Sequence, residues 1–346
     1  MSTPTDAAAA AAGSATVMTY REAITAALDD AMAADDVVLL MGEDVGADGG
    51  VFKTNSGLIE KYGPERVRNT PICENGFLGV ALGMSLVGMR PIVEIMFADF
   101  LPSAGDALVN QLPKYRFMSG GQTAVPVTVR IIGGATGRFG AQHSATGESW
   151  FMHLPGLRVV TASSPGAAYS LLRAAVDHQN PVLFYEHKGL YGRKGPVVRG
   201  ETAEIGKAAV LRPGGDVTIV ATLLMVERAL QAADELAQLG IEAEIIDLRW
   251  LRPLDLRTLR ASVEKTGRIL VVEEQVHAAG WGATIISELT ISGIVWASAP
   301  RRVSLPDDLP MPYTPPLEDE ILPSVGAIVA EAKASVGGRG GPMRPP

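Results

Sequence analysis

One glutamate stands in a setting that suits proton transfer. Glu74 lies in the octet Thr-Pro-Ile-Cys-Glu-Asn-Gly-Phe, residues 70–77, between an extended apolar stretch and a glycine-rich apolar helix. A carboxyl group with apolar neighbours is a candidate for a raised pKa, and it could hydrogen-bond a heterocycle and help move a proton. The octet alone favours a plainer role, in which Glu74 only complements the positive end of the helix dipole. The remaining segments reverse that preference.

A histidine follows a loop that is too rich in glycine to pack as a helix. His143 comes directly after residues 133–142, Gly-Gly-Ala-Thr-Gly-Arg-Phe-Gly-Ala-Gln. An imidazole after a flexible loop at the carboxyl end of a strand is well placed for proton transfer. It could equally cap a helix or bind its own backbone, and the pattern leaves both open. The loop has neither a P-loop ending nor a dinucleotide fingerprint, so we do not expect nucleotide binding there.

Two further groups are expected where strands end. Glu43 and Asp44 follow a continuous apolar run, and ligand sites of α/β proteins form at the carboxyl edge of the sheet. A solvated loop fits this pair equally well. Met96 and Phe100 close the next strand, where an aromatic ring can stack on a planar ligand for about 0.5–1.5 kcal/mol beyond burial. Core packing is the commoner role for such residues.

Alternating strand-like and helix-like patterns predict two α/β units. An unbroken apolar run such as residues 37–41 is typical of a strand covered on both faces, so we expect parallel sheets with helices on both sides. Strands are predicted at 37–41, 91–97, 126–132, 157–161 and 181–186, then at 217–221, 241–248, 269–272 and 302–305. Helices are predicted near 24–32, 76–88, 103–117 and 165–178, then at 223–237, 255–266, 282–294 and 324–336.

Glycine and proline interrupt this rhythm between residues 189 and 215. The expected organisation is therefore a disordered arm (1–16), a first domain (17–200), a linker (201–215), a second domain (216–336) and a disordered tail (337–346).

Composition excludes several classes of protein. The formal charge of −8 argues against nucleic-acid binding, which needs an excess of lysine and arginine. The single cysteine, Cys73, can form no intramolecular disulfide or cysteine-cluster zinc site, and its apolar neighbours predict a small buried core residue. A reducing, cytoplasmic compartment fits. The longest apolar stretch, 77–89, is too short to span a membrane, and no basic residue of a secretory signal precedes Arg21.

Eight segments in order and with matching spacing resemble one known family. They include Gly-Glu-Asp-Val-Gly at 42–46, Thr-Pro-Ile-Cys-Glu at 70–74 and Ala-Gln-His-Ser at 141–144. The others are 62–67, 88–94, 114–121, 153–157 and 180–184. Over residues 18–336 the chain resembles the β subunit of the thiamine-diphosphate-dependent decarboxylase component of 2-oxo acid dehydrogenase complexes.

The resemblance implies a fold and an assembly. The first half would be a pyrimidine-binding domain of the thiamine-diphosphate-binding fold, and the second a transketolase C-terminal-type domain. Two α and two β subunits would assemble, with thiamine diphosphate between α and β. The α subunit would bind the diphosphate and its magnesium ion, and the Gly-Asp-Gly…Asn-type motif for that purpose is missing from this sequence. The acyl group would pass to a lipoyl-bearing acyltransferase core.

The resemblance also assigns roles to residues around the cofactor. Glu74 matches the family glutamate that hydrogen-bonds N1′ of the aminopyrimidine and so promotes loss of the thiazolium C2 proton. Phe100 matches an aromatic residue against the pyrimidine, with Met96 and Ile72 lining the same pocket. Glu43 matches a nearby polar contact.

Two further roles follow from the same resemblance. His143 matches the histidine that assists acyl transfer to the lipoyl arm, and a positioned acid or base contributes roughly 10²–10⁴-fold. A structural potassium site would use backbone carbonyls near Val127, Ala175, Val176, His178 and Asn180.

Departures from the family pattern leave the substrate open. Ala145-Thr146 stands where the family often has glutamine, and 75–77 also differs from the commoner variants. Residues 186–192 resemble pyruvate- and acetoin-type members, whereas 97–100 resembles branched-chain members. The leading hypothesis is a pyruvate dehydrogenase-like β subunit. The alternatives are an acetoin dehydrogenase β subunit and a non-catalytic scaffold subunit, while the missing dinucleotide fingerprint disfavours a nicotinamide-dependent oxidoreductase.

Overall fold

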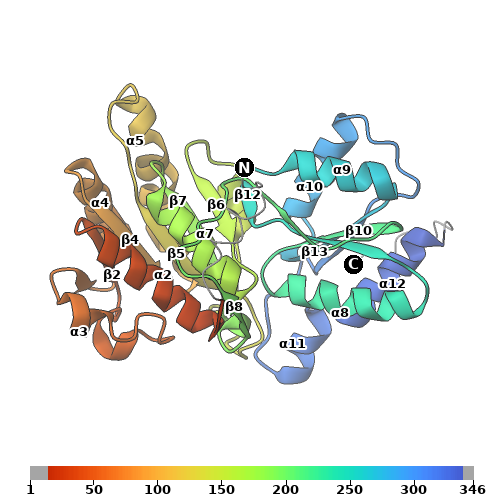
Figure 1. The fold of residues 1–346 in the computed structure, drawn as a ribbon, viewed down its shortest axis with the longest axis horizontal. Coiled ribbons are helices and arrows are strands. Elements are labelled where there is room, and N and C mark those ends of the chain that lie inside the picture. The colour runs from red at the N-terminus through yellow and green to blue at the C-terminus, as the bar shows by residue number, and fades with distance from the viewer. Residues whose placement is uncertain (1–14, 338–346) are drawn as a thin grey trace, which may run out of the picture.

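The computed structural model describes residues 15–337, which form two α/β units lying side by side (Figure 1). The first unit is built on a seven-stranded sheet of order β12-β6-β7-β5-β4-β2-β3. All neighbours in it are parallel except β12 and β6. The strands are β2 (Val38–Gly42), β3 (Val67–Asn69), β4 (Arg90–Ile95), β5 (Thr128–Gly133), β6 (Arg158–Thr161), β7 (Val182–His187) and β12 (Trp250–Arg252).

Helices cover both faces of this sheet, as expected. Alternate strand residues such as Leu40 and Met41 belong to different hydrophobic clusters, because successive side chains of a strand point to opposite faces. One face packs on α2 (Tyr20–Ala34) and α7 (Pro165–Asp177), and the other on α4 (Glu74–Leu86) and α5 (Leu112–Met118). Shorter helical segments include α3 (Leu58–Tyr62), α6 (Glu148–Met152), η1 (Ala47–Gly49) and η4 (Lys188–Leu190).

The single helix predicted near 103–117 is wrong in detail. The segment consists of a 3-10 helix η2 (Ala98–Ala104), a π-helix η3 (Ala107–Gln111) and then α5. Pro102 lies inside the first piece and Pro113 near the start of the last. Because proline has no backbone N–H, it removes the bond that would continue a regular α-helical ladder.

The second unit has a five-stranded sheet of order β14-β13-β10-β11-β9, in which only β9 is antiparallel to its neighbour. Its strands are β9 (Ala209–Arg212), β10 (Val217–Ala221), β11 (Ala243–Asp247), β13 (Ile269–Val276) and β14 (Arg301–Leu305). Its helices are α8 (Leu224–Gln238), α9 (Leu256–Thr266), α10 (Trp281–Ile291), α11 (Pro315–Ile321) and α12 (Val325–Val336).

The expected boundaries need three corrections. The range 201–215, predicted as a linker, contains β9, because antiparallel pairing with β11 recruits it to the second sheet. β12 comes from the second half of the chain but pairs with β6 of the first sheet. Residue Thr16 of the expected arm lies in β1 (Thr16–Thr19), which pairs with β8 (Lys194–Val197). Residues 1–14 and 338–346 lie outside the described part of the chain.

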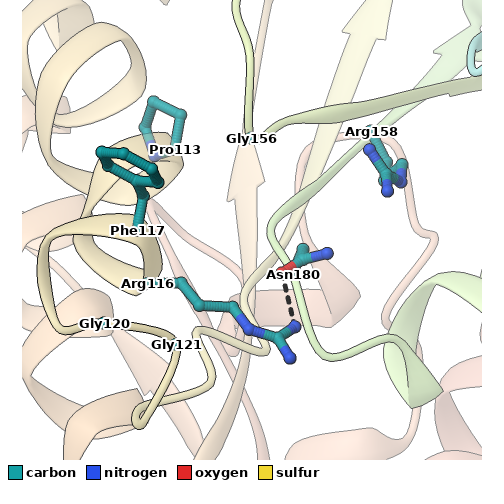
Figure 2. A pocket seen from close by; sticks show the side chains of 8 residues that line it. All are labelled: Pro113, Arg116, Phe117, Gly120, Gly121, Gly156, Arg158 and Asn180. Carbon is teal, nitrogen blue, oxygen red and sulfur yellow. Dashed lines mark hydrogen bonds between the residues drawn. The ribbon is translucent and has the colours of Figure 1, made fainter.

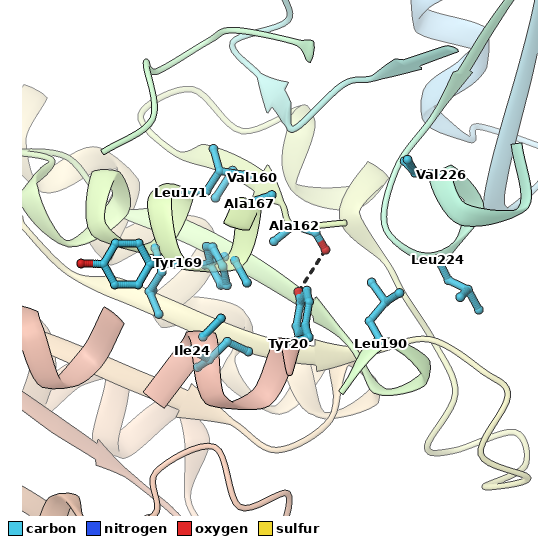
Figure 3. Packing of buried hydrophobic residues seen from close by; sticks show 14 of the residues in the cluster. Tyr20, Ile24, Val160, Ala162, Ala167, Tyr169, Leu171, Leu190, Leu224 and Val226 are labelled. Carbon is cyan, nitrogen blue, oxygen red and sulfur yellow. Dashed lines mark hydrogen bonds between the residues drawn. The ribbon is translucent and has the colours of Figure 1, made fainter. Parts of the chain in front are cut away.

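Apolar packing joins the two units into one body. A single hydrophobic cluster contains Tyr20 and Leu190 of the first unit together with Leu224 and Val226 of α8 (Figure 3). The buried Tyr20 hydroxyl donates to the Ala162 carbonyl at 3.0 Å. Within residues 15–337, no helix combines the length and apolar character needed to cross a bilayer.

Candidate functional site

Two glutamates meet at the carboxyl edge of the first sheet. Glu43 follows the end of β2, and Glu74 is the first residue of α4, shortly after β3. β2 and β3 are neighbours, and Thr70 N–H donates to the Gly42 carbonyl at 2.9 Å, so the two connections leave the sheet together. Burial raises the pKa of the Glu43 carboxyl, and the nearby charge of Glu74 adds to that rise. The two carboxyl groups therefore lie near each other in a partly desolvated environment.

The Glu43 carboxyl keeps a buried oxygen that could accept a hydrogen bond from an external donor. Its Oε1 atom is buried, yet it has no hydrogen-bond partner among residues 15–337. An unpaired buried acceptor is costly, so such an atom in a native protein usually marks a missing partner. Glu74 is buried as well. An aminopyrimidine, which carries both N–H donors and ring-nitrogen acceptors, fits this pair of carboxyl groups.

The residues before Glu74 lie on the surface. Ile72 is 84% exposed, although it was expected to line the cofactor pocket. The prediction that Cys73 is a buried core residue is wrong, since its side chain is exposed. Cys73 occupies the N-cap of α4, where the backbone is not yet helical, and its apolar sequence neighbours do not enclose it.

Aromatic rings surround the imidazole of His143. Its ring lies edge-on to Phe97, with centroids 4.6 Å apart, and to Phe100 at 5.6 Å. Phe97 and Phe100 are themselves 5.4 Å apart. Such pairs contribute about 0.5–1.5 kcal/mol each beyond burial. Met96, predicted beside them, is half-buried at the end of β4. The tertiary structure therefore brings His143 to the aromatic segment that sequence analysis had treated separately.

The strand order explains why these groups share one edge. β2, β4 and β5 are adjacent and parallel, so the residues after them emerge side by side. Glu43 follows β2, Phe97 follows β4, and the loop bearing His143 follows β5. The predicted site residues thus fall into a carboxyl pair and an aromatic–imidazole cluster along the same edge.

Sequence reasoning missed the groups that hold His143 in place. Lys188 Nζ donates to the His143 carbonyl at 2.5 Å, and the N–H of Ala145 donates to Asp99 Oδ2 at 3.1 Å. Burial lowers the pKa of Lys188 to about 8, against the opposing charges of Asp99, Glu274 and Glu318. The Glu-His-Lys triplet at 186–188 was a possible signal, because it lies where β7 ends at this edge of the sheet. His187 within it is buried, and its ring forms a hydrogen bond with Glu274 Oε2 at 2.9 Å.

The carbonyls predicted to bind potassium lie around the C-terminal end of α7. Several of them already accept hydrogen bonds, including Val127 from the Val182 N–H and Ala175 from the His178 N–H. The Val176 carbonyl accepts from the guanidinium of Arg90 at 2.8 Å. Because the Arg90 guanidinium already occupies the Val176 carbonyl, a monovalent cation would have to share that carbonyl with a positive charge.

A cavity of about 580 Å³ lies at the opposite edge of the sheet (Figure 2). It is open near the amino ends of β6 and β7, and Arg116 donates to Asn180 Oδ1 across it at 2.7 Å. Its lining consists of Pro113, Arg116, Phe117, Gly120, Gly121, Gly156, Arg158 and Asn180. Parallel strands place their two edges far apart, so this cavity is separate from the glutamate pair.

Comparison with known proteins shows the family to which this chain belongs. Residues 16–194 match the transketolase pyrimidine-binding domain, and residues 206–328 match the transketolase C-terminal domain. The chain is 44% identical, over 95% of its length and 89% of the relative's, to the pyruvate dehydrogenase E1 component subunit beta-2, mitochondrial, of Oryza sativa subsp. japonica. It belongs to the family of E1 component β subunits. Membership implies the use of thiamine diphosphate.

Other relatives carry a different activity in their names. The chain is 41% identical to the β subunit of acetoin:2,6-dichlorophenolindophenol oxidoreductase of Cupriavidus necator, over 93% of this chain and 98% of the relative. It is 40% identical to the pyruvate dehydrogenase E1 β subunit of Rhizobium meliloti, over 96% and 72%. A solved split-gene transketolase, described as an inactive β4 tetramer, has the same fold with a TM-score of 0.77 at 24% identity, over 92% and 98% of the two chains.

Proposed function

We propose that this chain is the β subunit of a pyruvate dehydrogenase-type E1 component, which decarboxylates a 2-oxo acid and passes the acyl group to a lipoyl arm. The observation that carries the proposal is the pair of Glu43 and Glu74, in which a buried Glu43 oxygen has no hydrogen-bond partner within residues 15–337. Thiamine diphosphate, when bound, supplies the carbanion chemistry that a protein side chain cannot.

The protein's own residues bind and orient that cofactor. Glu74 hydrogen-bonds the pyrimidine ring nitrogen and holds the proton that is exchanged there. Glu43 accepts from a neighbouring N–H, which satisfies its unpaired buried oxygen. Phe100 and Met96 exclude water from the ring, and Ile72 does so once the α subunit covers it, so the carboxyl groups act in a low-dielectric pocket where charge interactions are strong.

His143 acts later in the reaction, as an acid or base during acyl transfer. Its half-buried ring is held edge-on between two phenylalanines, which fixes its direction without consuming its ring nitrogens. A positioned group of this kind contributes about 10²–10⁴-fold.

The proposed assembly is an α2β2 heterotetramer. The α subunit supplies magnesium and the diphosphate site, and it covers the exposed Ile72. A lipoyl-bearing acyltransferase core receives the acyl group. A cytoplasmic location and a potassium ion at the carbonyl cluster around Asn180 remain predictions.

An acetoin dehydrogenase β subunit is the second candidate, because a relative of nearly the same identity bears that name. The cofactor-binding residues would keep their roles, and the substrate would be a hydroxyketone. Co-expression with an α subunit, followed by turnover on pyruvate, acetoin and 2-oxoisovalerate, distinguishes the two.

The test of the catalytic role is Glu74→Gln in the assembled α/β complex with thiamine diphosphate and magnesium. We expect near-complete loss of decarboxylation, because the amide cannot exchange a proton with the ring nitrogen. Glu235→Gln, at an exposed position on α8, is the matched control and should retain full activity. Full activity of the Glu74 variant would instead make this chain a scaffold.

A further inference from the structure

The loop that carries His143 is anchored at both ends to the second unit of the same chain. This loop, residues 134–146, is called the His143 loop below. At its start, the Ala135 N–H donates to Glu274 Oε1 at 2.6 Å, and at its end the Thr146 hydroxyl donates to the Glu274 carbonyl at 2.6 Å. Glu274 belongs to β13 of the second sheet. Glu274, a residue of the second unit, therefore binds both ends of the loop.

The middle of the His143 loop is bound to helix α11. Arg138 donates to the Pro315 carbonyl at 3.0 Å and pairs with Asp319 at 2.9 Å. Its Nη1 atom also lies 3.4 Å from Glu318 Oε1. Glu318 is fully buried, and neither of its oxygens has a hydrogen-bond partner among residues 15–337. Arg138 is the one ion-pair partner of Glu318 in that range, and the more distant ammonium of Lys188 adds a second positive charge near this buried carboxylate.

The other side of the loop is held by the first unit. Lys188 binds the carbonyl of His143 itself, and Asp99 accepts from the N–H of Ala145, two residues later. The Lys188 ammonium also lies 5.1 Å from the centre of the Phe97 ring, which packs against His143. Lys188 thus contacts both the backbone of the histidine and the ring that orients its side chain.

Backbone strain makes these anchors necessary. Thr136 and Arg138 have φ angles of +72° and +60°, in the left-handed region that non-glycine residues rarely adopt. Such conformations persist only where the surrounding contacts impose them. The contacts of Arg138 with α11 are therefore among those that hold the loop, and with it His143, in this conformation.

We infer that Arg138 and Lys188 are positioning residues for His143, and that α11 of the second unit sets the reach of this histidine through Arg138. The second unit then has a direct part in acyl transfer, although it contributes no group to the glutamate pair. This inference rests on the role proposed above for His143.

The test compares Arg138→Met with Arg212→Met in the assembled α/β complex. Arg212 of β9 forms an ion pair with the exposed Asp234 of α8, so its loss controls for removal of a surface guanidinium. Two activities are measured: decarboxylation with an artificial electron acceptor, and acyl transfer to an isolated lipoyl domain. Hydrogen exchange of 134–146 and 315–321 is measured in parallel.

We expect Arg138→Met to slow acyl transfer by about 10²-fold, the typical effect of a misplacement of about 1 Å, with less than about a threefold change in decarboxylation. Exchange should rise in both segments together. Because Glu318 would be left buried without its ion-pair partner, the double variant Arg138→Met/Glu318→Gln should regain part of the loop protection. Lys188→Met should slow acyl transfer but leave residues 315–321 protected.

Unchanged acyl transfer and exchange in Arg138→Met would overturn the inference. His143→Ala separates this failure from a failure of the proposed function. If His143→Ala leaves acyl transfer intact, the role of the histidine is wrong. If it abolishes transfer while Arg138→Met does not, the histidine acts as proposed but needs no anchor on α11.

Discussion

A buried carboxyl group at the junction of the two units should make stability depend on pH. Glu148 is the first residue of α6 and is fully buried, and its carboxylate accepts from the side-chain amide of Gln275 on β13. Burial is the main cause that raises the pKa of Glu148 to about 8, and the charge of Glu274 adds to it. We expect Glu148→Gln, which keeps the acceptor but cannot ionise, to remove this dependence.

The sign of the pH dependence of stability follows from the number of protons bound in the folded and unfolded states. Between pH 4.5 and about 8, the folded protein keeps Glu148 protonated while the unfolded chain releases the proton. The folded state then binds more protons, so its stability falls as pH rises through this window and the loss is complete above about pH 8. The difference between about 8 and 4.5, at about 1.36 kcal/mol per pH unit, corresponds to an upper limit on the order of 5 kcal/mol.

The measurement is the melting temperature of wild type and Glu148→Gln at pH 5, 6, 7 and 8 in the assembled complex. The variant should match wild type near pH 5 and gain up to about 2–3 °C per pH unit above it. Glu235→Gln on the exposed face of α8 should show no such trend. A difference between variant and wild type that stays constant from pH 5 to 8 would show that Glu148 titrates normally, and the reasoning from burial would be wrong.

Two further substitutions test the core and the start of the His143 loop. Arg130→Met should destabilise the protein by about 3–5 kcal/mol in denaturant titration, because the fully buried Arg130 pairs with Glu94 at 2.8 Å and Glu186 at 2.6 Å; a loss below about 1 kcal/mol would contradict this. Gly134→Ala should lower the melting temperature markedly, because Gly134 has φ +85° and a Cβ would lie 2.0 Å from His187 Nε2; an unchanged melting temperature would mean that the loop start can move freely.

Periodic segments of the chain were predictable because the pattern and the structure arise from the same local geometry. The helix predicted near 24–32 is α2, and the strand at 217–221 is β10 with the same bounds. Some short elements were not predicted, because they depend on contacts with distant segments and not on a local pattern. β12, for example, has three residues and exists only because β6 offers it an edge, which no local pattern records.

The candidate site was predictable as separate pieces. Glu43, Glu74 and His143 were each selected because they follow strands or begin a helix, and all three do so. Their grouping depended on strand order, which places β2, β3, β4 and β5 side by side. Ile72 shows the limit of the approach, because an apolar residue beside a site can be exposed in the single chain.

The amino-acid sequence by itself determined the two α/β units, the family and the chemical types of the groups at the sheet edge, because these depend on local periodicity and on short ordered motifs. Only the tertiary structure decided that a Glu43 oxygen beside Glu74 finds no hydrogen-bond partner in the described part of the chain, and that Arg138 reaches Glu318, 180 positions away in the sequence. The burial of these carboxyl groups and the position of their charged partners depend on contacts between distant segments, and those contacts form only when the chain folds.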